Sequence, residues 1–404
     1  MCKAMISAVV LTAALAFATP AFAGGFDDHD FRGDYAFHFT GMFTLKGSYS
    51  PNIEPADCRG VIGNHSRRLL PAPIMVRFVV VTTFDTGGDT DAPGEFNTWV
   101  VNFPLPIVIP FPQGYHHLRY NVEKRVLAIE TGEGPTHMAA SITALANDPR
   151  FDLSHAYWML AGIAGIDPNV GPVASAAWAE YVVDGDLAFE IDAREIPQDW
   201  STGYVPLGRT SPYQLPVPPA SSINGVNLFH LYPGFVNWAY QFSQAHVKLP
   251  DTTNLQTVRS FYKTYPKTQS PPLVLKGDTL AAAHFWIGGL LNTWAENWVS
   301  YWSHGKATFT MAAEEDAGYM QALTFLSQVN KIDFKRVLDL RAASDFTVPY
   351  PGQTVAELLA NDASGTGVSG FLESLNDVYL TGSAVVNEIV DHWDRYGSRT
   401  PSAP

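Results

Sequence analysis

The sequence predicts an α/β fold, a three-layer α/β/α sandwich around a central mixed, mainly parallel sheet. Two observations predict it. Short apolar runs with strong β propensity recur along the chain, and they alternate with longer segments of helical composition. Strands that are apolar throughout are typical of parallel sheets covered on both faces, and alternation with helices supplies the cover. No internal repeat is visible, so we expect one domain with insertions.

The first 23 residues predict a secretory signal peptide. Lys3 gives a positive start, residues 6–17 are apolar, and Ala21-Phe22-Ala23 is a small-x-small cleavage site. The apolar run is shorter than the ~20 residues that a transmembrane helix needs. We therefore expect an exported protein, periplasmic or secreted, without a membrane span after signal removal. Residues 24–73 are polar and aperiodic, which indicates an N-terminal extension before a domain at 74–404.

Composition excludes some classes of function. The net charge of -14 argues against nucleic-acid or anionic-membrane surfaces, which need clustered Lys and Arg. Cys2 is removed with the signal peptide, so Cys58 has no partner and no intramolecular disulfide is expected. Stability must come from a hydrophobic core, to which most of the 10 Trp, 17 Tyr and 24 Phe would contribute.

The expected elements follow in chain order. Strands are expected at residues 74–84, 126–130, 156–161, 274–278 and 337–341. Helices are expected at residues 137–146, 228–244, 252–263, 279–301 and 317–328. The Pro-, Gly- and Ser-rich stretch at 196–227 is expected to be a loop-rich insertion.

Four segments at the expected element boundaries carry candidate functional residues. Residues 131–136 (Thr-Gly-Glu-Gly-Pro-Thr) separate a strand from a helix, and residues 162–165 (Gly-Ile-Ala-Gly) close the next strand. Residues 313–318 (Ala-Glu-Glu-Asp-Ala-Gly) open a helix, and Ser344 and Asp345 follow the last strand. Ligands bind at the carboxyl ends of strands in open α/β sheets, whereas a lone Ser-Asp is more often a helix N-cap.

The order of these segments resembles the purine nucleoside phosphorylase and nucleosidase superfamily. That superfamily uses a strand-glycine loop, a TG-x-AG turn, an EMEAAG sugar-binding motif and a terminal SD. The resemblance is closest to the branch named purine nucleoside permease, whose FD-x-G-x-D-x-x-x-PGEF signature appears at residues 84–96. It extends from about residue 76 to about residue 350, and it implies a nucleoside phosphorylase-like fold, a purine nucleoside substrate and no metal or organic cofactor.

The resemblance assigns roles to three acidic positions. Asp345 matches the acid that protonates the departing base, a step worth about 10²–10⁴-fold in rate. Glu315, with Glu314 beside it, matches the ligand of the ribose hydroxyls. Ala313 and Glu314 depart from the family motif, which leaves the register of Glu314, Glu315 and Asp316 open. Glu315 could instead be an acidic residue favoured in the first turn of a helix.

Other positions have a functional and a structural interpretation. Glu95 resembles the base that activates water, or it simply enters a helix after a Pro-Gly turn. Phe189 resembles the aromatic residue that stacks on the purine, or it is a core residue. Gly165 would lie beside the base. Thr136 could bind ribose or cap a helix, and both are compatible.

The charges in the glycine loops help to predict whether water or phosphate is the nucleophile. The loops contain Gly87, Gly88, Gly132 and Gly134 together with six acidic residues, and they contain no arginine. A phosphorylase usually binds its dianion with several arginines, so the sequence favours water over phosphate. An arginine from the insertion, Arg194 or Arg209, or from a neighbouring subunit of a homo-oligomer remains an alternative.

Metal binding is not indicated by the sequence. Residues 27–30 (Asp-Asp-His-Asp) and the His116-His117 pair lack convincing ligand spacing. The function expected is an exported purine nucleoside N-glycosidase, hydrolytic rather than phosphorolytic. The alternatives are a purine nucleoside phosphorylase and a soluble nucleoside-binding protein that assists transport. Asp345 and Glu315 facing each other across a pocket would indicate chemistry, and either one pointing away would indicate capture alone.

Overall fold

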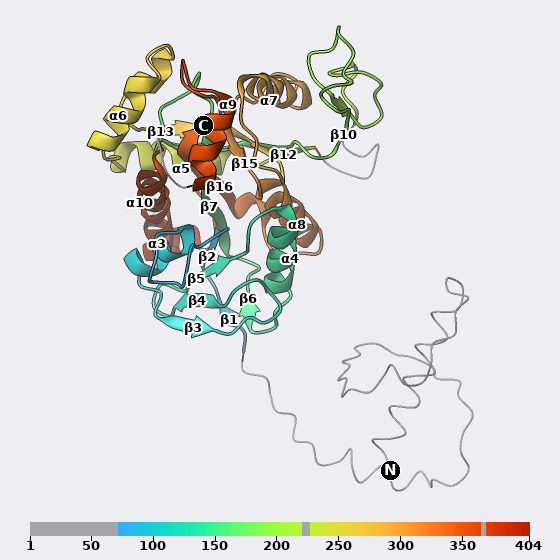
Figure 1. The fold of residues 1–404 in the computed structure, drawn as a ribbon. Helices are drawn as coiled ribbons and strands as arrows, with labels where there is room; N and C mark the ends of the chain where they lie inside the picture. Colours follow the sequence, from blue (N-terminus) through green and yellow to red (C-terminus); the bar gives the residue numbers. More distant parts are fainter. Residues whose placement is uncertain (1–71, 220–226, 365–368) are drawn as a thin grey trace, which may run out of the picture. The chain divides into compact units, whose positions relative to one another are not determined.

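The computed structural model describes residues 72–219, 227–364 and 369–404 (Figure 1). The predicted signal peptide and nearly all of the predicted extension lie outside these residues, as do residues 220–226 of the expected insertion. Residues 72–404 form one compact unit.

The centre of the sheet consists of parallel strands. β2 (Phe78–Thr82) lies between β5 (Val126–Glu130) and β7 (Tyr157–Ile166), and it is parallel to both. β16 (Val337–Phe346) is parallel to β7 along its whole length. Every residue of β2 and β5 is buried, as expected of parallel strands covered on both faces. The carboxyl ends of these strands lie at one edge of the sheet.

Antiparallel strands make the sheet mixed. β15 (Phe309–Ala313) is antiparallel to the end of β7 and parallel to β14 (Asp278–Ala281), which continues to β9 (Tyr181–Asp184) and the edge strand β12 (Leu228–His230). The other strands of this sheet are β3 (Ile107–Ile109), β4 (Leu118–Asn121), β8 (Ala176–Trp178) and β13 (Val274–Lys276). Two small sheets pair β1 (Ile74–Met75) with β6 (Phe151–Asp152) and β10 (Ala188–Glu190) with β11 (Tyr204–Pro206).

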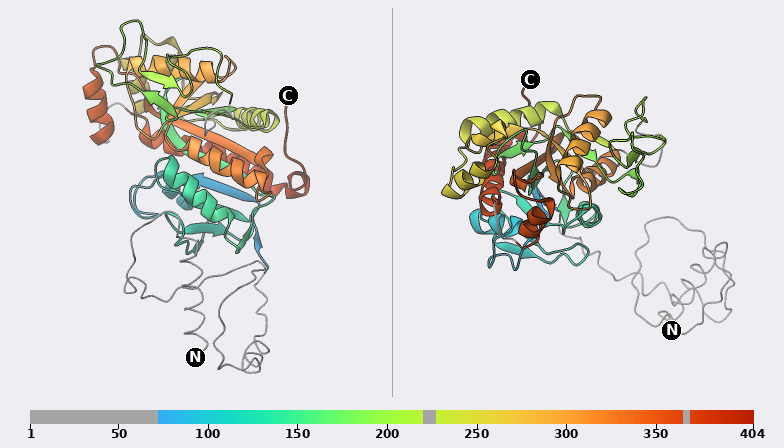
Figure 2. Two further views of the ribbon diagram at one scale, coloured as in Figure 1. Left: turned by 90° about the vertical axis from the view of Figure 1, so that its right-hand side faces the viewer. Right: turned by 45° about the horizontal axis from the view of Figure 1, so that its top comes forward.

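Helices cover both faces of the sheet (Figures 1 and 2). α4 (Pro135–Ala146) and α8 (Asp316–Gln328) pack against each other on one face. The other face carries α3 (Glu95–Asn102), α5 (Pro233–His246) and the long α10 (Phe371–Asp391). The remaining helices are α6 (Thr253–Phe261), α7 (Gly289–Trp302), α9 (Val355–Ser364), α11 (Trp393–Tyr396) and the 3-10 turns Pro266–Gln269 and Phe334–Arg336. The predicted α/β/α architecture with a mixed sheet is confirmed.

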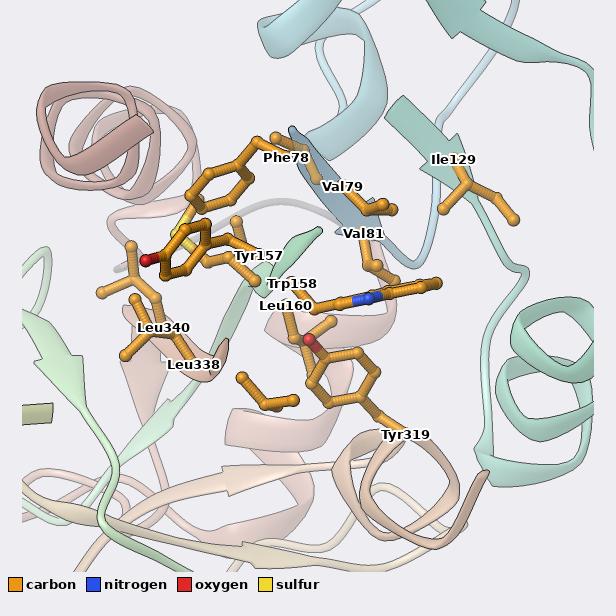
Figure 3. Close-up of a cluster of buried hydrophobic side chains, with 14 of the residues drawn as sticks. Phe78, Val79, Val81, Ile129, Tyr157, Trp158, Leu160, Tyr319, Leu338 and Leu340 are labelled. Carbon is orange, nitrogen blue, oxygen red and sulfur yellow. The ribbon is translucent and has the colours of Figure 1, made fainter. Parts of the chain in front are cut away.

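The core lies between the central strands and the helices. Figure 3 shows Trp158 of β7 between Val81 of β2 and Tyr319 of α8, whereas Phe78 and Tyr157 lie together on the opposite side of the strands. Phe78, Tyr157 and Trp158 are fully buried. Burying each such side chain stabilises the fold by about 1.5–3 kcal/mol, so these strands form a firm base for residues at their ends.

Several predicted boundaries are wrong. β7 continues through residues 162–165, and β16 continues through Asp345, so both motifs lie inside strands. The segments 228–244 and 279–301 each begin with a strand, because β12 and β14 find pairing partners before the helix starts. The expected single strand at 274–278 is two strands, β13 and β14.

None of the helices in the described part of the chain is long and apolar enough to cross a bilayer.

Candidate active site

A buried arginine organises the carboxyl ends of the central strands. Arg341 of β16 is only 1% exposed. Its Nη2 donates to Glu315 Oε2 at 2.8 Å and to Asp316 Oδ2 at 2.5 Å, and its Nη1 donates to the carbonyl oxygen of Ile163 at 3.0 Å. Glu95 Oε1 lies 4.0 Å from Nη1. One guanidinium therefore connects β16, β7, the start of α3 and the start of α8.

Glu95, the predicted water activator, is enclosed at this arginine. Its carboxylate accepts hydrogen bonds from the amide and hydroxyl of Thr83 at 2.7 and 2.9 Å and from the amide of Ile163 at 2.7 Å. Burial raises the pKa of Glu95 to about 7, although the positive charge of Arg341 opposes the shift. A near-neutral pKa is what a general base needs, and the hydrogen bonds also show that Glu95 joins β2 to β7.

Gly162 leaves the space in which this cluster forms. A Cβ at residue 162 would lie 2.4 Å from Arg341 Nη1 and 2.7 Å from Glu95 Oε1. Any side chain would therefore displace two buried charged groups. The first glycine of the Gly-Ile-Ala-Gly motif is explained by this contact, whereas the motif was expected to be a turn.

The structure settles the register of the acidic motif before α8. Glu315 is buried, and besides Arg341 it binds the backbone amide of Gly134 through Oε1 at 3.1 Å. Asp316 is also buried and accepts from Arg341 through both oxygens. Glu314 alone faces the cleft described below. Burial, reinforced by the neighbouring charges of Glu315 and Glu133, raises the pKa of Glu314 to about 7.

The second glycine loop, residues 131–136, lies against the acidic motif before α8 and is joined to it by the Gly134 amide. Gly132 and Gly134 adopt positive φ angles of 82° and 83°, which favour glycine. A Cβ at Gly318 would lie 2.3 Å from the carbonyl oxygen of Pro135, so this glycine lets α8 approach the start of α4. The predicted capping role of Thr136 is wrong. Gly134 occupies the cap position, and Thr136 is exposed in the first turn of α4.

A small cleft with an accessible volume of about 20 Å³ lies beside the ends of β7, β15 and β16. Its lining includes Asp345, Gly165, Glu314 and the aromatic residues Phe285 and Trp286. A ligand pocket typically has a volume of about 300–1,000 Å³, so the side chains that line this cleft must move before a nucleoside can enter it. It combines acidic groups with aromatic surface, which suits a ligand with a flat ring and hydroxyl groups.

Asp345 is placed in the cleft by an irregularity in β16. The register with β7 shifts between Ala343 and Asp345, and such a bulge re-aims a side chain. Asp345 is half-buried and accepts a hydrogen bond from Ser344 Oγ at 2.7 Å. Burial raises the pKa of its carboxyl group. Gly165 lies beside it, since a Cβ there would be 3.0 Å from Asp345 Oδ1.

Phe189, the predicted stacking residue, does not line the cleft. It lies in β10, opposite Val205 of β11, and its side chain is 54% exposed. Phe285 and Trp286 take the place expected for it, because they follow β14 at the edge where the cleft opens. The sequence analysis included both aromatic residues in the expected helix at residues 279–301, so it missed them as cleft residues.

The segment with the aromatic pair is held by an acidic residue. Asp186 accepts a hydrogen bond from the backbone amide of Ala283 at 2.5 Å, and its Oδ1 lies 3.3 Å from His284 Nδ1. The hydrogen bond with Asp186 raises the pKa of His284. His284 also lines the cleft, so the structure adds a titratable group that the sequence analysis did not include.

The first glycine loop is joined to a basic cluster. Asp89, two residues after Gly87 and next to Gly88, accepts from His117 Nε2 at 2.6 Å and from Arg119 Nε at 2.5 Å. Gly87 and Gly88 lie against Asp91 of the same loop. Arg119 lies outside this loop in the sequence, but in the structure it brings a positive charge to the loop. That charge is directed at Asp89.

The family model and the related proteins below agree on one family. The family model described as purine nucleoside permease (NUP) matches residues 75–401. A purine nucleoside permease of Candida albicans is 29% identical over 303 residues, which cover 74% of this chain and 71% of the relative. A probable purine nucleoside permease of Schizosaccharomyces pombe is 28% identical over 284 residues, which cover 69% of this chain and 80% of the relative.

Solved structures with a related arrangement are more distant. A 5'-methylthioadenosine/S-adenosylhomocysteine nucleosidase from Neisseria meningitidis has a TM-score of 0.43 and 11% identity, and the match covers 78% of this chain and 99% of that one. A futalosine hydrolase of Helicobacter pylori has a TM-score of 0.44 and 13% identity, covering 78% and 98%. Likenesses at this level carry no conclusion about activity. The family model spans well over half of the sequence, and the chain belongs to the purine nucleoside permease family.

Proposed function

We propose that this protein binds a purine nucleoside in the cleft beside Asp345 and cleaves the bond between base and sugar. The observation that carries the proposal is Asp345 itself. It is a half-buried carboxyl group with a raised pKa, and it shares a cleft with an aromatic pair and with Glu314. The family name and the names of the relatives support a purine nucleoside as the ligand.

The chemistry requires an acid at the base. Breaking the N-glycosidic bond puts negative charge on the departing purine and positive charge on the sugar. Asp345 would donate its proton to the base as the bond breaks, and its raised pKa keeps that proton available. Phe285 or Trp286 would stack on the purine, in place of Phe189.

The sugar would lie toward the acidic motif. Glu314 faces the cleft and would accept hydrogen bonds from ribose hydroxyls. Glu315 would contribute negative charge beneath the developing oxocarbenium ion, from a position fixed by Arg341 and by the amide of Gly134. This assignment keeps both glutamates in the sugar site and gives them different tasks.

Water is the nucleophile that the charges favour. Arg341 is engaged by Glu315 and Asp316, and Arg119 is engaged by Asp89. Neither arginine is free to hold a phosphate dianion. Water would attack the anomeric carbon, leaving free ribose and the free base that carries the proton of Asp345. Glu95 is buried and does not line the cleft, so it would take the water proton only after its contacts with Thr83 and Ile163 open. The near-neutral pKa of Glu95 supports its role as the acceptor.

Nucleoside capture for a separate transporter is a second candidate. The relatives are named permeases, and Glu315 points to Arg341 and not across the cleft at Asp345. The second observation is the arrangement that the sequence analysis expected of capture alone. Both observations fit a protein that binds nucleosides without turnover. In either case we propose that residues 1–23 direct export.

The products distinguish these functions. Purified protein is incubated with adenosine, inosine and guanosine, with and without phosphate, and the sugar is identified. We expect free ribose at the same rate under both conditions. Ribose 1-phosphate formed only with phosphate would indicate a phosphorylase, and saturable binding without products would indicate capture.

Asp345→Asn tests the residue that carries the proposal. The amide cannot donate a carboxyl proton, so we expect kcat to fall about 10²–10⁴-fold while nucleoside binding persists. Asp333→Asn, at a half-exposed carboxyl in the loop before β16, serves as the matched control and should retain full activity. Unchanged turnover in Asp345→Asn would remove the assignment.

A further inference from the structure

Asp89, His116 and His117 bring three metal-ligand groups together at the first glycine loop. His116 Nε2 lies 3.7 Å from Asp89 Oδ1, and His117 Nε2 lies 2.6 Å from Asp89 Oδ2. One ligand atom from each residue lies within 4.8 Å of the other two. The two imidazole rings are 4.0 Å apart between centroids, so their Nε2 atoms approach the carboxylate from the same direction.

The hydrogen bonds leave one carboxylate oxygen available. Arg119 and His117 both contact Oδ2 of Asp89. Oδ1 makes no hydrogen bond with the described residues and faces His116. Asp89 can therefore coordinate an ion through Oδ1 while Arg119 orients the carboxylate through Oδ2. Because Arg119 contacts Oδ2, it does not block an ion that binds at Oδ1.

A second carboxylate lies behind His116. The Nδ1 atom of His116 is buried without a hydrogen-bond partner among the described residues, and it lies 3.6 Å from Glu130 Oε2. Metal-binding histidines usually direct their other ring nitrogen at a carboxylate or carbonyl, which fixes the ring and strengthens the ligand. His116 lies between Asp89 on one side and Glu130 on the other, which is this arrangement.

The local charge also favours a cation. Asp85 and Glu95 add two further carboxyl groups close to Glu130, beside that of Asp89. Arg119 supplies one positive charge to Asp89. A divalent ion would offset the remaining negative charge. The histidine side chains are 28% and 30% exposed, so an ion can reach them from solvent.

We propose that Asp89, His116 and His117 bind a divalent late first-row transition metal ion, with Zn²⁺ the best match, and that water completes the coordination. Two imidazoles and one carboxylate suit Zn²⁺, Co²⁺ or Ni²⁺, whereas Mg²⁺ and Ca²⁺ prefer oxygen ligands throughout. Metal–ligand bonds of about 2.0–2.2 Å require His117 to move slightly away from Oδ2. The bound ion would tie the glycine loop to the segment before β4. This role is independent of nucleoside cleavage.

Co²⁺ and Zn²⁺ titrations test the site. The full chain is prepared without a polyhistidine tag, stripped with chelator and titrated with Co²⁺ by visible absorption and with Zn²⁺ by calorimetry. We expect a site with one-to-one stoichiometry and micromolar or tighter affinity. The double variant His116→Ala/His117→Ala should weaken that site at least 100-fold. Glu130→Gln should weaken it about tenfold through the ligand His116.

The matched control keeps the number of histidines equal. The double variant His246→Ala/His392→Ala removes two exposed histidines elsewhere and should bind metal like the wild type. Circular dichroism confirms that each variant is folded. Two results would overturn the proposal: no one-to-one binding in the micromolar range, or equal binding by the wild type and the His116/His117 double variant.

Discussion

Arg341 is the residue on which the arrangement of the site depends most. It is buried, and it compensates carboxylates from α3 and α8 while binding a backbone carbonyl of β7. An isolated charge is costly in a protein interior, so Arg341 and its carboxylate partners each need the other to stay buried as ions. Neighbouring Asp339 is buried as well, and burial together with Asp316 raises its pKa well above the usual range. Burial therefore favours the protonated forms of Asp339 and Glu95 in this cluster.

Removing the guanidinium should destabilise the fold. Arg341→Ala leaves Glu315 and Asp316 buried without a counter-charge, and losing one partner of such a pair costs about 3–5 kcal/mol. We expect that decrease in the free energy of unfolding by urea denaturation. Arg341→Lys should recover only part of it, because an ammonium cannot make the forked contacts. Arg194→Ala, at an arginine with an 87% exposed side chain, is the control. Equal stability of Arg341→Ala and wild type would contradict the role assigned here.

Glu95 should make stability depend on pH. Its pKa is raised from 4.5 to about 7, so the folded state binds more protons than the unfolded state between these values. Stability therefore falls as pH rises through this window, and one such group contributes up to about 1.4 kcal/mol per pH unit. Glu95→Gln should reduce the slope of unfolding free energy against pH from 4.5 to 7, whatever its effect on absolute stability. Glu123→Gln, at an exposed glutamate, should leave the slope unchanged. The same slope in Glu95→Gln would show that another group is responsible.

At the scale of elements, β7 and β16 do more than the sequence indicated. We expected both strands to stop before their motifs, but each runs on for several residues and remains paired with the other. The glycines of β7 make room for charged side chains of β16, and the bulge in β16 turns Asp345 into the cleft. The site is thus built inside a strand pair. A loop following the strands would hold these groups less firmly.

The close approach at β7 predicts a large effect of one methyl group. Gly162→Ala places a Cβ 2.4 Å from Arg341 Nη1, so we expect a loss of about 1–3 kcal/mol and a loss of cleavage activity. Gly289→Ala is the matched control in α7. A Cβ there meets nothing within 4 Å, and alanine favours the helix by about 0.5–1 kcal/mol. Thermal and urea unfolding measure both. A Gly162→Ala protein as stable as the wild type would show that the charged cluster can shift without cost.

At the scale of the whole molecule, the described unit contains its own core and the complete candidate site. Residues 72–404 form one compact unit, and the family model begins at residue 75. The core of the sheet and its covering helices belong to this unit. We therefore expect it to fold independently of the residues before it.

A shortened chain tests this independence. A protein that starts at Ala72 should show the same cooperative thermal transition as the full chain, within a few degrees, because its core is unchanged. It should also retain any nucleoside cleavage, measured by release of free base. The full chain is the control. A shortened chain that is unfolded by circular dichroism would contradict the prediction.

The fold class and the family could be inferred from sequence alone, whereas the role of Asp345 as an acid stays a prediction. Apolar strands alternate with helices along the chain, and four motifs in a fixed order indicate the family. The sequence assigned Gly165 to the base, and its approach to Asp345, with a Cβ at this position 3.0 Å from Oδ1, was found only in the structure. The fold class and the family depend on local pattern and chain order, which a sequence records directly.

Only the tertiary structure decided which side chains meet. It assigned Glu314 to the cleft and Glu315 to Arg341, replaced Phe189 with Phe285 and Trp286, and brought Arg119 to Asp89. The physical reason is that side-chain direction follows from strand register, bulges and the packing of residues distant in sequence. Adjacent residues such as Glu314 and Glu315 then point into different surroundings, which composition and spacing do not encode.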